Sequence, residues 1–305
     1  MKAAIVSSTD EETKFKDQYE KHLRALKLQG MSGSTINLYS RSLRRIYAYF
    51  NRAPDKLLVA DLEQYFSDLV DSHSWSMVKI DCSALQFYWK HVLKRNWRFI
   101  NIVKPPQVRR IPDILTIGEI SDLLSHIELL RYRVVLFGIY SMGLRISEGV
   151  NLRVCDIDKH TMQVHIRNGK GHKDRLVPMP YSTYNAFKKY WVVHKNPKLI
   201  FPNIMGGSYT VMHTPKIMNI QCVQAAFRAA VVDTKINKRV SVHSLRHSYA
   251  THLLEANVNL RVVQKILGHA RIETTTRYTH FTKEILVNSG SIINSMVSKI
   301  HFHDL

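Results

Sequence analysis

The sequence predicts a mainly α-helical protein of two domains, with one small β-sheet in the C-terminal domain. Its 305 residues suggest two domains. Apolar residues recur at a helical period over most of the chain, and a single stretch near residue 164 alternates as a strand does. Hydrophobic residues make up 45% of the chain, enough to build a core, so disorder of the whole chain is excluded.

The first domain is predicted to be a small bundle of about four helices over residues 14–100. Residues 1–13 are polar and acidic, and we expect a flexible leader there. The next helix signal follows Ser34 and Thr35, which can cap a helix. Apolar stripes at helical period support the bundle. They comprise Ile36, Tyr39, Leu43, Ile46, Tyr47 and Phe50, then Leu62, Tyr65, Phe66 and Leu69, then Val78, Cys82, Leu85, Trp89 and Val92.

A basic linker is predicted over residues 101–114, NIVKPPQVRRIPDI. Its three prolines and its lack of any sustained period disfavour a helix and favour an extended chain. The second domain then covers residues 115–305 and ends in a short amphipathic tail.

The second domain opens with a capping box, because Thr116 is followed three residues later by Glu119. Alternation over 162–166, a glycine-containing turn and the segment 176–178 predict a pair of strands. Most of the remainder is predicted to be helical, most clearly over residues 131–140, 221–231, 244–255 and 260–267.

The charge balance indicates a polyanionic partner. The chain has 44 Lys and Arg against 24 Asp and Glu, a net charge of +20. Up to residue 104 the counts are 17 and 11, and beyond it 27 and 13, so both halves are basic. Counterion release would then contribute to binding. A ribosomal or simply basic cytosolic protein remains an alternative at this point.

The cysteines and the N-terminus favour a soluble cytoplasmic protein. Cys82, Cys155 and Cys222 form no CxxC pair, so neither a disulfide framework nor a thiolate metal site is expected. The N-terminus has no apolar signal region, and the longest strongly apolar run, 134–140, is too short to cross a bilayer.

The reactive residue types favour metal-free chemistry on a phosphodiester. Only 13 acids follow residue 104, and they form no cluster typical of metal-dependent nucleases. A metal-free reaction needs two fixed cations, a proton donor and a nucleophile. Four motifs could supply them: GLRISE with Arg145 and Glu148, NGKGHKDR with Lys170, Lys173 and Arg175, HSLRHSYATHLLE with His243, Arg246 and His247, and TTTRYTHF with Tyr278.

Each motif also has an ordinary structural interpretation. Arg145 and Glu148 could be an exposed ion pair, and Lys173 and Arg175 fit a solvated turn that touches a DNA backbone. His243 and His247 are spaced i,i+4, like the two histidines that bind zinc in an HExxH helix. The glutamate of that motif and a third ligand are missing, so no metal is predicted.

Taken in order, the motifs GLRxSE, HxLRH and LGH followed by a tyrosine resemble those of the tyrosine recombinases, or phage integrase family, in particular Xer-like and mobile-element integrases. The LGH motif contributes His269, and Tyr278 follows nine residues later. The resemblance covers essentially the whole chain. It implies an N-terminal helical core-binding (SAM-like) domain joined to a catalytic domain.

The resemblance implies a role for each site residue. Arg145 and Arg246 would grip the scissile phosphate, Lys170 would protonate the leaving 5′ oxygen, and Tyr278 would be the nucleophile. His243 and His269 would support proton transfer and phosphate binding, and Glu148 would support the site. The duplex would be held by a wider basic set: Arg41, Arg44, Arg45, Lys79, Lys90, Lys94, Lys173 and Arg175.

The resemblance therefore implies a site-specific recombinase that integrates or excises DNA through a 3′-phosphotyrosine, without cofactor or metal. Its partner would be double-stranded DNA, bound by a homotetramer on two sites. The C-terminal tail would dock on a neighbouring protomer, although intramolecular packing stays open. Two other functions also stay open: DNA relaxation like that of a type IB topoisomerase, and DNA binding without catalysis.

Overall fold

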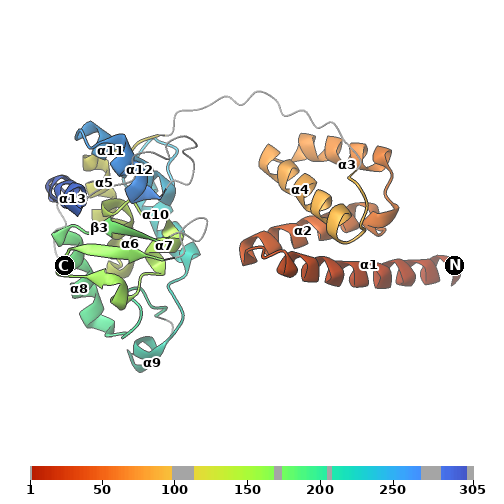
Figure 1. The fold of residues 1–305 in the computed structure, drawn as a ribbon, viewed down its shortest axis with the longest axis horizontal. Coiled ribbons are helices and arrows are strands. Elements are labelled where there is room, and N and C mark those ends of the chain that lie inside the picture. Colours follow the sequence, from red (N-terminus) through yellow and green to blue (C-terminus); the bar gives the residue numbers. More distant parts are fainter. Residues whose placement is uncertain (1, 98–112, 168–173, 205–207, 269–282, 301–305) are drawn as a thin grey trace. The chain divides into compact units, whose positions relative to one another are not determined.

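The computed structural model describes residues 2–97, 113–167, 174–204, 208–268 and 283–300. The chain divides into two compact units, residues 1–109 and 110–305 (Figure 1). Each unit has its own hydrophobic core. No helix among these described residues is both long enough and apolar enough to span a membrane.

The N-terminal unit is the predicted helical bundle. It consists of α1 (Lys2–Leu28), α2 (Gly33–Phe50), α3 (Val59–Ser72) and α4 (Trp75–His91), with a short 3-10 helix at Pro54–Lys56. The stripes expected from the sequence meet in its core, where Leu43, Ile46 and Leu85 are fully buried. The cap of α2 is Ser32, whose hydroxyl accepts a hydrogen bond from the amide of Thr35.

Residues 2–13 of the expected leader are helical in the structure, as part of α1. One of its acidic residues, Glu11, has partners elsewhere in the bundle. The carboxylate of Glu11 accepts a hydrogen bond from the amide of Ala53 at 3.1 Å and pairs with Lys56. One turn later, Lys14 forms an ion pair with Asp55 at 2.7 Å. These long-range pairs join the part of α1 around residues 11–14 to the rest of the bundle, which the composition of the segment does not reveal.

The C-terminal unit is helical around a three-stranded sheet. The capping box at Thr116 and Glu119 opens α5 (Ile117–Ser125), as predicted. The buried α6 (Leu130–Ser141) follows and leads into the short α7 (Ile146–Val150). The remaining helices are α8 (Tyr181–His194), α9 (Ser208–His213), α10 (Ile220–Asp233), α11 (Val242–Glu255), α12 (Leu260–Leu267) and α13 (Lys283–Val297).

The sheet is antiparallel in the order β1 (Ile157–Asp158), β2 (Gln163–Ile166) and β3 (Arg175–Pro178). The last two are the predicted pair, and Ile166 is opposite Arg175 at the end next to the connection. β1 was not predicted from the sequence. A short 3-10 helix, Val154–Asp156, precedes it.

The amphipathic tail packs on its own catalytic unit. Ile293 of α13 is fully buried, and Met296, Val297 and Ile300 are nearly so, all within the main core cluster. The side-chain oxygen of Asn294 also accepts a hydrogen bond from the amide of Tyr181 at 2.8 Å, at the start of α8. Through residue 300, the tail therefore adopts the intramolecular alternative.

Candidate active site

A buried carboxylate organises the predicted site. Glu148, on α7, has a side chain that is only 7% exposed. It accepts a hydrogen bond from the backbone amide of Arg145 at 2.9 Å, which caps α7, and another from Nη1 of Arg145 at 2.7 Å. The GLRISE motif therefore forms a buried contact, which excludes the interpretation of an exposed ion pair.

A second arginine binds the same carboxylate. Nη1 and Nη2 of Arg175 donate to the two oxygens of Glu148 at 2.9 and 2.7 Å. Burial alone would raise the pKa of Glu148, but hydrogen bonds and positive charge from Arg175, with hydrogen bonds from Arg145, lower it to about 2. Glu148 is therefore ionised at neutral pH.

Arg246, on α11, completes the cluster. Its side chain is 2% exposed, and its Nη1 donates to the carbonyl of Gly143 at 2.7 Å. The same Nη1 lies 3.7 Å from Glu148. Burial, followed by the positive charge of Arg145, lowers the pKa of Arg246 to about 10, so the guanidinium stays charged at neutral pH. Three cations thus surround one anion.

The end of α12 binds all three arginines. Its last carbonyl groups have no partners within the helix and carry the negative end of the helix dipole. The carbonyl of Ile266 accepts from Nε of Arg175 at 2.7 Å, and that of Leu267 accepts from Nη2 of Arg246. The carbonyl of Gly268 accepts a longer bond, at 3.5 Å, from Nη2 of Arg145.

Two glycines allow this close packing. Gly143 and Gly268 have φ angles of +60° and +62°, a backbone region that disfavours other residues. A Cβ atom on Gly143 would lie 2.4 Å from the ring of Tyr249 and 2.8 Å from Leu267. Gly268 ends α12 in the left-handed conformation, as expected from the sequence.

The two histidines at the start of α11 lie beside Arg246. The rings of His243 and His247 meet edge to face, with centroids 4.5 Å apart. Burial lowers the pKa of both, and the positive charge of Arg246 lowers them further. His243 is exposed, so its imidazole can reach a ligand. Within the described ranges, no group of three or more His, Cys, Asp or Glu side chains is placed to hold a metal ion.

Lys170, Lys173, His269 and Tyr278 lie outside the described residues, as does the turn predicted between the strands. Side-chain contacts hold the chain on either side of that turn. Arg167 pairs with the buried Asp156, and Nε2 of His165 lies 3.0 Å from the carboxylate of Asp174.

Arg175 corrects a prediction, because its side chain is not solvated. Only 9% of it is exposed, and it faces the cluster instead of a free surface. A sequence signal for this exists: Arg175 and the buried Val177 are two residues apart on β3, so they share one face, whereas Leu176 between them is exposed.

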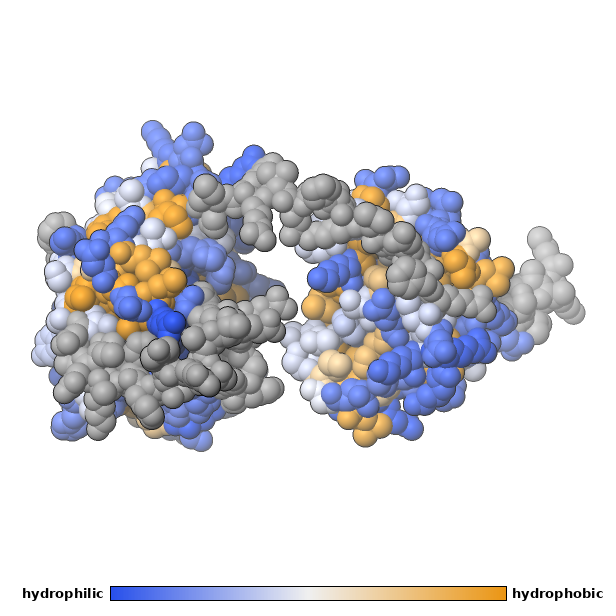
Figure 2. Space-filling view, turned by 45° about the horizontal axis from the view of Figure 1, so that its top comes forward, coloured by the Kyte–Doolittle hydropathy of each residue, from blue (hydrophilic) through white to orange (hydrophobic). Residues whose placement is uncertain are grey.

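Arg45 also differs from the predicted DNA-binding set. Its guanidinium forms an ion pair with Asp81, a fully buried acid that also accepts a hydrogen bond from the hydroxyl of Tyr65 at 2.6 Å. The other predicted basic residues of this unit are exposed. They are Arg41, Arg44, Lys79, Lys90 and Lys94. Hydrophilic residues cover much of the face of this unit that Figure 2 shows.

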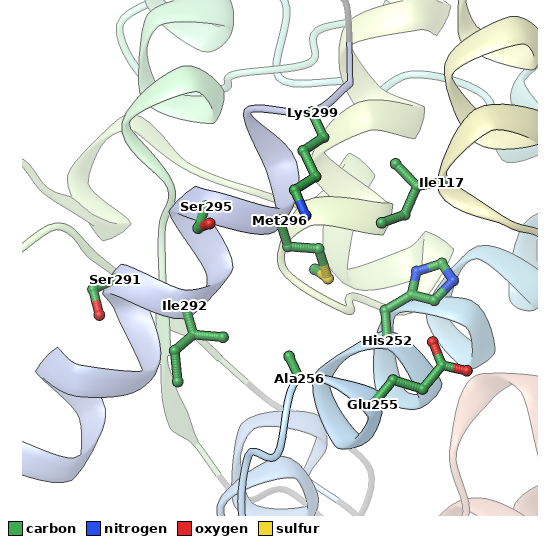
Figure 3. Close-up of a pocket in the computed structure, with 9 residues that line it drawn as sticks. All are labelled: Ile117, His252, Glu255, Ala256, Ser291, Ile292, Ser295, Met296 and Lys299. Atoms are coloured by element: carbon green, nitrogen blue, oxygen red, sulfur yellow. The ribbon is translucent and has the colours of Figure 1, made fainter.

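A separate pocket of about 490 Å³ lies between the C-terminal end of α11 and α13 (Figure 3). Its lining includes His252 and Glu255 from α11, and Ile292 and Met296 from α13. None of the predicted site residues that the structure describes lines it. Nδ1 of His252 is 2.9 Å from the hydroxyl of Tyr140, a contact that fixes this ring.

Comparisons with known proteins agree with the fold. Residues 113–284 match the phage integrase family, and residues 19–99 match the N-terminal SAM-like domain of phage integrases. The chain is 32% identical over 263 residues to a tyrosine recombinase of Thermosipho africanus, an alignment covering 82% of this chain and 89% of the relative. It is 30% identical over 272 residues to tyrosine recombinase XerD of Listeria monocytogenes, covering 84% and 90%.

Solved structures show the same fold. The XerH site-specific recombinase bound to a palindromic difH substrate in a post-cleavage complex has a TM-score of 0.63 at 19% identity, with 98% of this chain and 87% of that chain covered. The Tn1549 transposon integrase with circular intermediate DNA has a TM-score of 0.60 at 19% identity, covering 84% and 92%. The chain belongs to the phage integrase family and is a tyrosine-type site-specific recombinase.

Proposed function

We propose that this recombinase cuts and rejoins double-stranded DNA through a covalent bond between Tyr278 and a 3′ phosphate. The observation that carries the proposal is the arginine cluster: one buried carboxylate, Glu148, binds Arg145 directly and lies 3.7 Å from Arg246. One anion among three cations leaves a net positive charge, and a scissile phosphate would supply the missing negative charge.

In the proposed reaction, the hydroxyl oxygen of Tyr278 attacks phosphorus and loses its proton. The bond from phosphorus to the 5′ oxygen breaks, and that oxygen takes a proton from Lys170. The products are a 3′-phosphotyrosine and a free 5′ hydroxyl. A 5′ hydroxyl from a second duplex then attacks the phosphotyrosine and gives its proton back to Lys170. The bond from phosphorus to the Tyr278 oxygen breaks, and that oxygen regains the proton it had lost, which rejoins the strand and releases the tyrosine. One phosphodiester replaces another, so no external energy source is needed.

Arg145 and Arg246 would bind the non-bridging oxygens and stabilise the charge of the transition state. His243 and His269 would assist proton transfer. The lowered pKa of His243 favours a neutral imidazole, which can accept a proton from a tyrosine hydroxyl or from water. The exposed basic residues of the N-terminal unit would bind the duplex backbone, and four protomers would join two sites for integration or excision.

The test begins with the recognition site, selected by binding the full chain to a library of random duplexes. The selected duplex is then nicked in turn at successive positions, so that cleavage just upstream of a nick releases a short strand and traps the adduct. With EDTA present, we expect a protein–DNA adduct that is stable in SDS. Tyr278→Phe should abolish it, and Tyr181→Phe, at a 62% exposed tyrosine, should not.

An adduct that persists in Tyr278→Phe, or no adduct with the wild type, would contradict the proposal. Exchange of strands between two labelled duplexes would separate recombination from DNA relaxation, because a topoisomerase relaxes supercoiled plasmid without joining two sites. Binding to the selected duplex without any adduct would support the noncatalytic alternative.

A further inference from the structure

Arg175 makes an unusually complete set of contacts for a residue that follows a basic turn. Each of its three side-chain nitrogens donates a hydrogen bond: Nε to Ile266, and both terminal nitrogens to Glu148. The fork of Arg175 is therefore paired with an anion, whereas Arg246, which is also buried, donates its hydrogen bonds to neutral carbonyls. A role in binding the duplex backbone does not fit this environment.

Its contacts join three elements that hold the reactive arginines. Arg175 lies on β3, Glu148 on α7 and Ile266 at the end of α12. The two carbonyls after Ile266 bind the other two arginines of the cluster, Arg246 and Arg145. If Arg175 were displaced, Glu148 and the end of α12 would be expected to shift. Arg145 and Arg246, the two proposed phosphate ligands, would then lose their positions as well.

Packing makes the position of Arg175 specific. A Cβ atom on Gly268 would lie 2.9 Å from Cδ of Arg175 and 3.2 Å from its Nε. The arginine side chain therefore lies directly against the peptide that ends α12. A planar fork with three donors fits two carboxylate oxygens and a carbonyl, whereas the single ammonium of a lysine cannot reproduce that geometry.

The charge arrangement suggests how Arg175 acts on Arg246. Arg175 occupies a lone-pair direction on each oxygen of Glu148. Arg246 lies 3.7 Å from the same carboxylate and donates its hydrogen bonds to the carbonyls of Gly143 and Leu267 instead. Without Arg175, Glu148 would have free lone pairs beside a second guanidinium. We expect Arg246 to turn toward them, because a buried carboxylate gains from each ionic hydrogen bond.

We propose that Arg175 is a positioning residue for the recombination reaction. By saturating Glu148 and holding the end of α12, it keeps Arg145 and Arg246 aimed at the scissile phosphate. This inference rests on the proposed cleavage chemistry. It assigns Arg175 no contact with DNA or with the reacting atoms.

The test compares Arg175→Gln and Arg175→Lys with the wild type on two nicked duplexes. One carries the ordinary phosphate, and the other a methylphosphonate at the cleavage position, where a methyl group replaces a charged oxygen. On the phosphate we expect Arg175→Gln to slow adduct formation on the order of 100-fold, as small displacements of catalytic groups do. On the methylphosphonate the loss in the rate of adduct formation should be at least about tenfold smaller. The methyl group removes negative charge that the arginines would otherwise stabilise in the transition state.

The ratio of the two losses does not depend on how much of the variant folds, so partial unfolding cannot imitate the result. Arg167→Gln is the matched control, since Arg167 also pairs with a buried acid, Asp156, but has no recorded hydrogen bond to Glu148 or α12. Any loss it causes should be equal on the two duplexes. Arg175→Lys should resemble Arg175→Gln, because it retains the charge without the fork.

Equal losses on the two duplexes for Arg175→Gln, or a wild-type rate for Arg175→Lys on the phosphate, would overturn the inference while leaving the proposed function intact. Failure of the wild type to form an adduct would instead refute the cleavage chemistry. The two failures are therefore distinguishable.

Discussion

Nη1 of Arg246 lies 3.7 Å from a carboxylate oxygen of Glu148 but donates its hydrogen bond, at 2.7 Å, to the carbonyl of Gly143. The charge of Glu148 thus stabilises Arg246 without binding it directly. This relationship leaves the guanidinium held by carbonyl groups, which are neutral. Its positive charge is then less completely neutralised than in a direct ion pair, a useful property in a residue proposed to bind phosphate.

Glu148→Gln should destabilise the catalytic unit in a pH-dependent way. The folded pKa of Glu148, about 2, is below its ordinary value of 4.5, so its contribution is complete above about pH 5 and is lost as the pH falls toward 2. The difference of about 2.5 pKa units corresponds to roughly 3 kcal/mol at neutral pH. Hydrogen exchange of α7 and α11 at pH 7 and at about pH 3 measures the effect.

The wild type and Glu148→Gln should differ most at pH 7 and by less than half as much near pH 3. A difference in stability that does not change with pH would mean that the charge of Glu148 contributes little, and that packing alone explains any loss.

Gly143→Ala should disrupt the arginine cluster. The new methyl group would overlap the ring of Tyr249 at 2.4 Å, at a residue whose φ is +60°. We expect a loss of at least about 2 kcal/mol of unfolding free energy from strain and overpacking. Gly118→Ala is the control, because a Cβ there would only touch Oγ1 of Thr116, at 4.0 Å. Gly118 also lies in α5, where alanine favours the helix by up to about 1 kcal/mol. Similar urea midpoints for both variants would contradict this account of Gly143.

His22→Leu should stabilise the N-terminal unit in mild acid. His22 is fully buried beside Phe87 and Tyr88, and neither ring nitrogen has a hydrogen-bond partner among the residues that the structure describes. Burial lowers its pKa from 6.5 to about 4, so the unfolded chain binds more protons between these values. The free energy of unfolding is therefore highest above about pH 6.5 and decreases as the pH is lowered, by roughly 2 kcal/mol at pH 5.

The measurement is hydrogen exchange of α1 and α4 in the full chain at pH 5 and pH 7. His22→Leu should gain protection relative to the wild type at pH 5 more than at pH 7. The same change at the exposed His73 should not. If the gain is the same at both pH values, His22 is not the group responsible.

Arg45 and Arg41 should respond differently to substitution by alanine, although both are on α2. Arg45→Ala would leave the buried Asp81 without its cationic partner, at a cost of about 3 to 5 kcal/mol. Arg41→Ala should change stability little but weaken DNA binding. The slope of log affinity against log salt concentration should decrease by about 1, the value for one lost phosphate contact. Thermal unfolding and DNA titrations at two salt concentrations separate the two roles. Unchanged stability in Arg45→Ala would refute the structural role.

Much of the fold follows from local sequence signals. The capping box at Thr116 and the apolar stripes of α2, α3 and α4 depend on neighbouring residues, and the structure confirms them. β1 has only two residues, too few to show an alternation. The pair that joins Glu11 of α1 to Lys56 links residues 45 positions apart, so it has no local sequence signal.

The site shows the same division. Arg145, Glu148 and Arg246 were predicted from their motifs, and the structure brings them together. The partners of Arg45 and Arg175 could not be predicted from spacing, because each is set by a tertiary contact across 27 or more residues. Charge alone does not separate a basic residue that faces DNA from one that binds a buried acid.

The most direct test of the central claim is to identify the residue that becomes covalently attached to DNA. The adduct formed on the nicked duplex in EDTA would be digested with protease and nuclease, and the modified peptide sequenced by mass spectrometry. We predict a nucleotide linked through its 3′ phosphate to Tyr278. Attachment at any other residue, or a modified peptide that lacks Tyr278, would contradict the account.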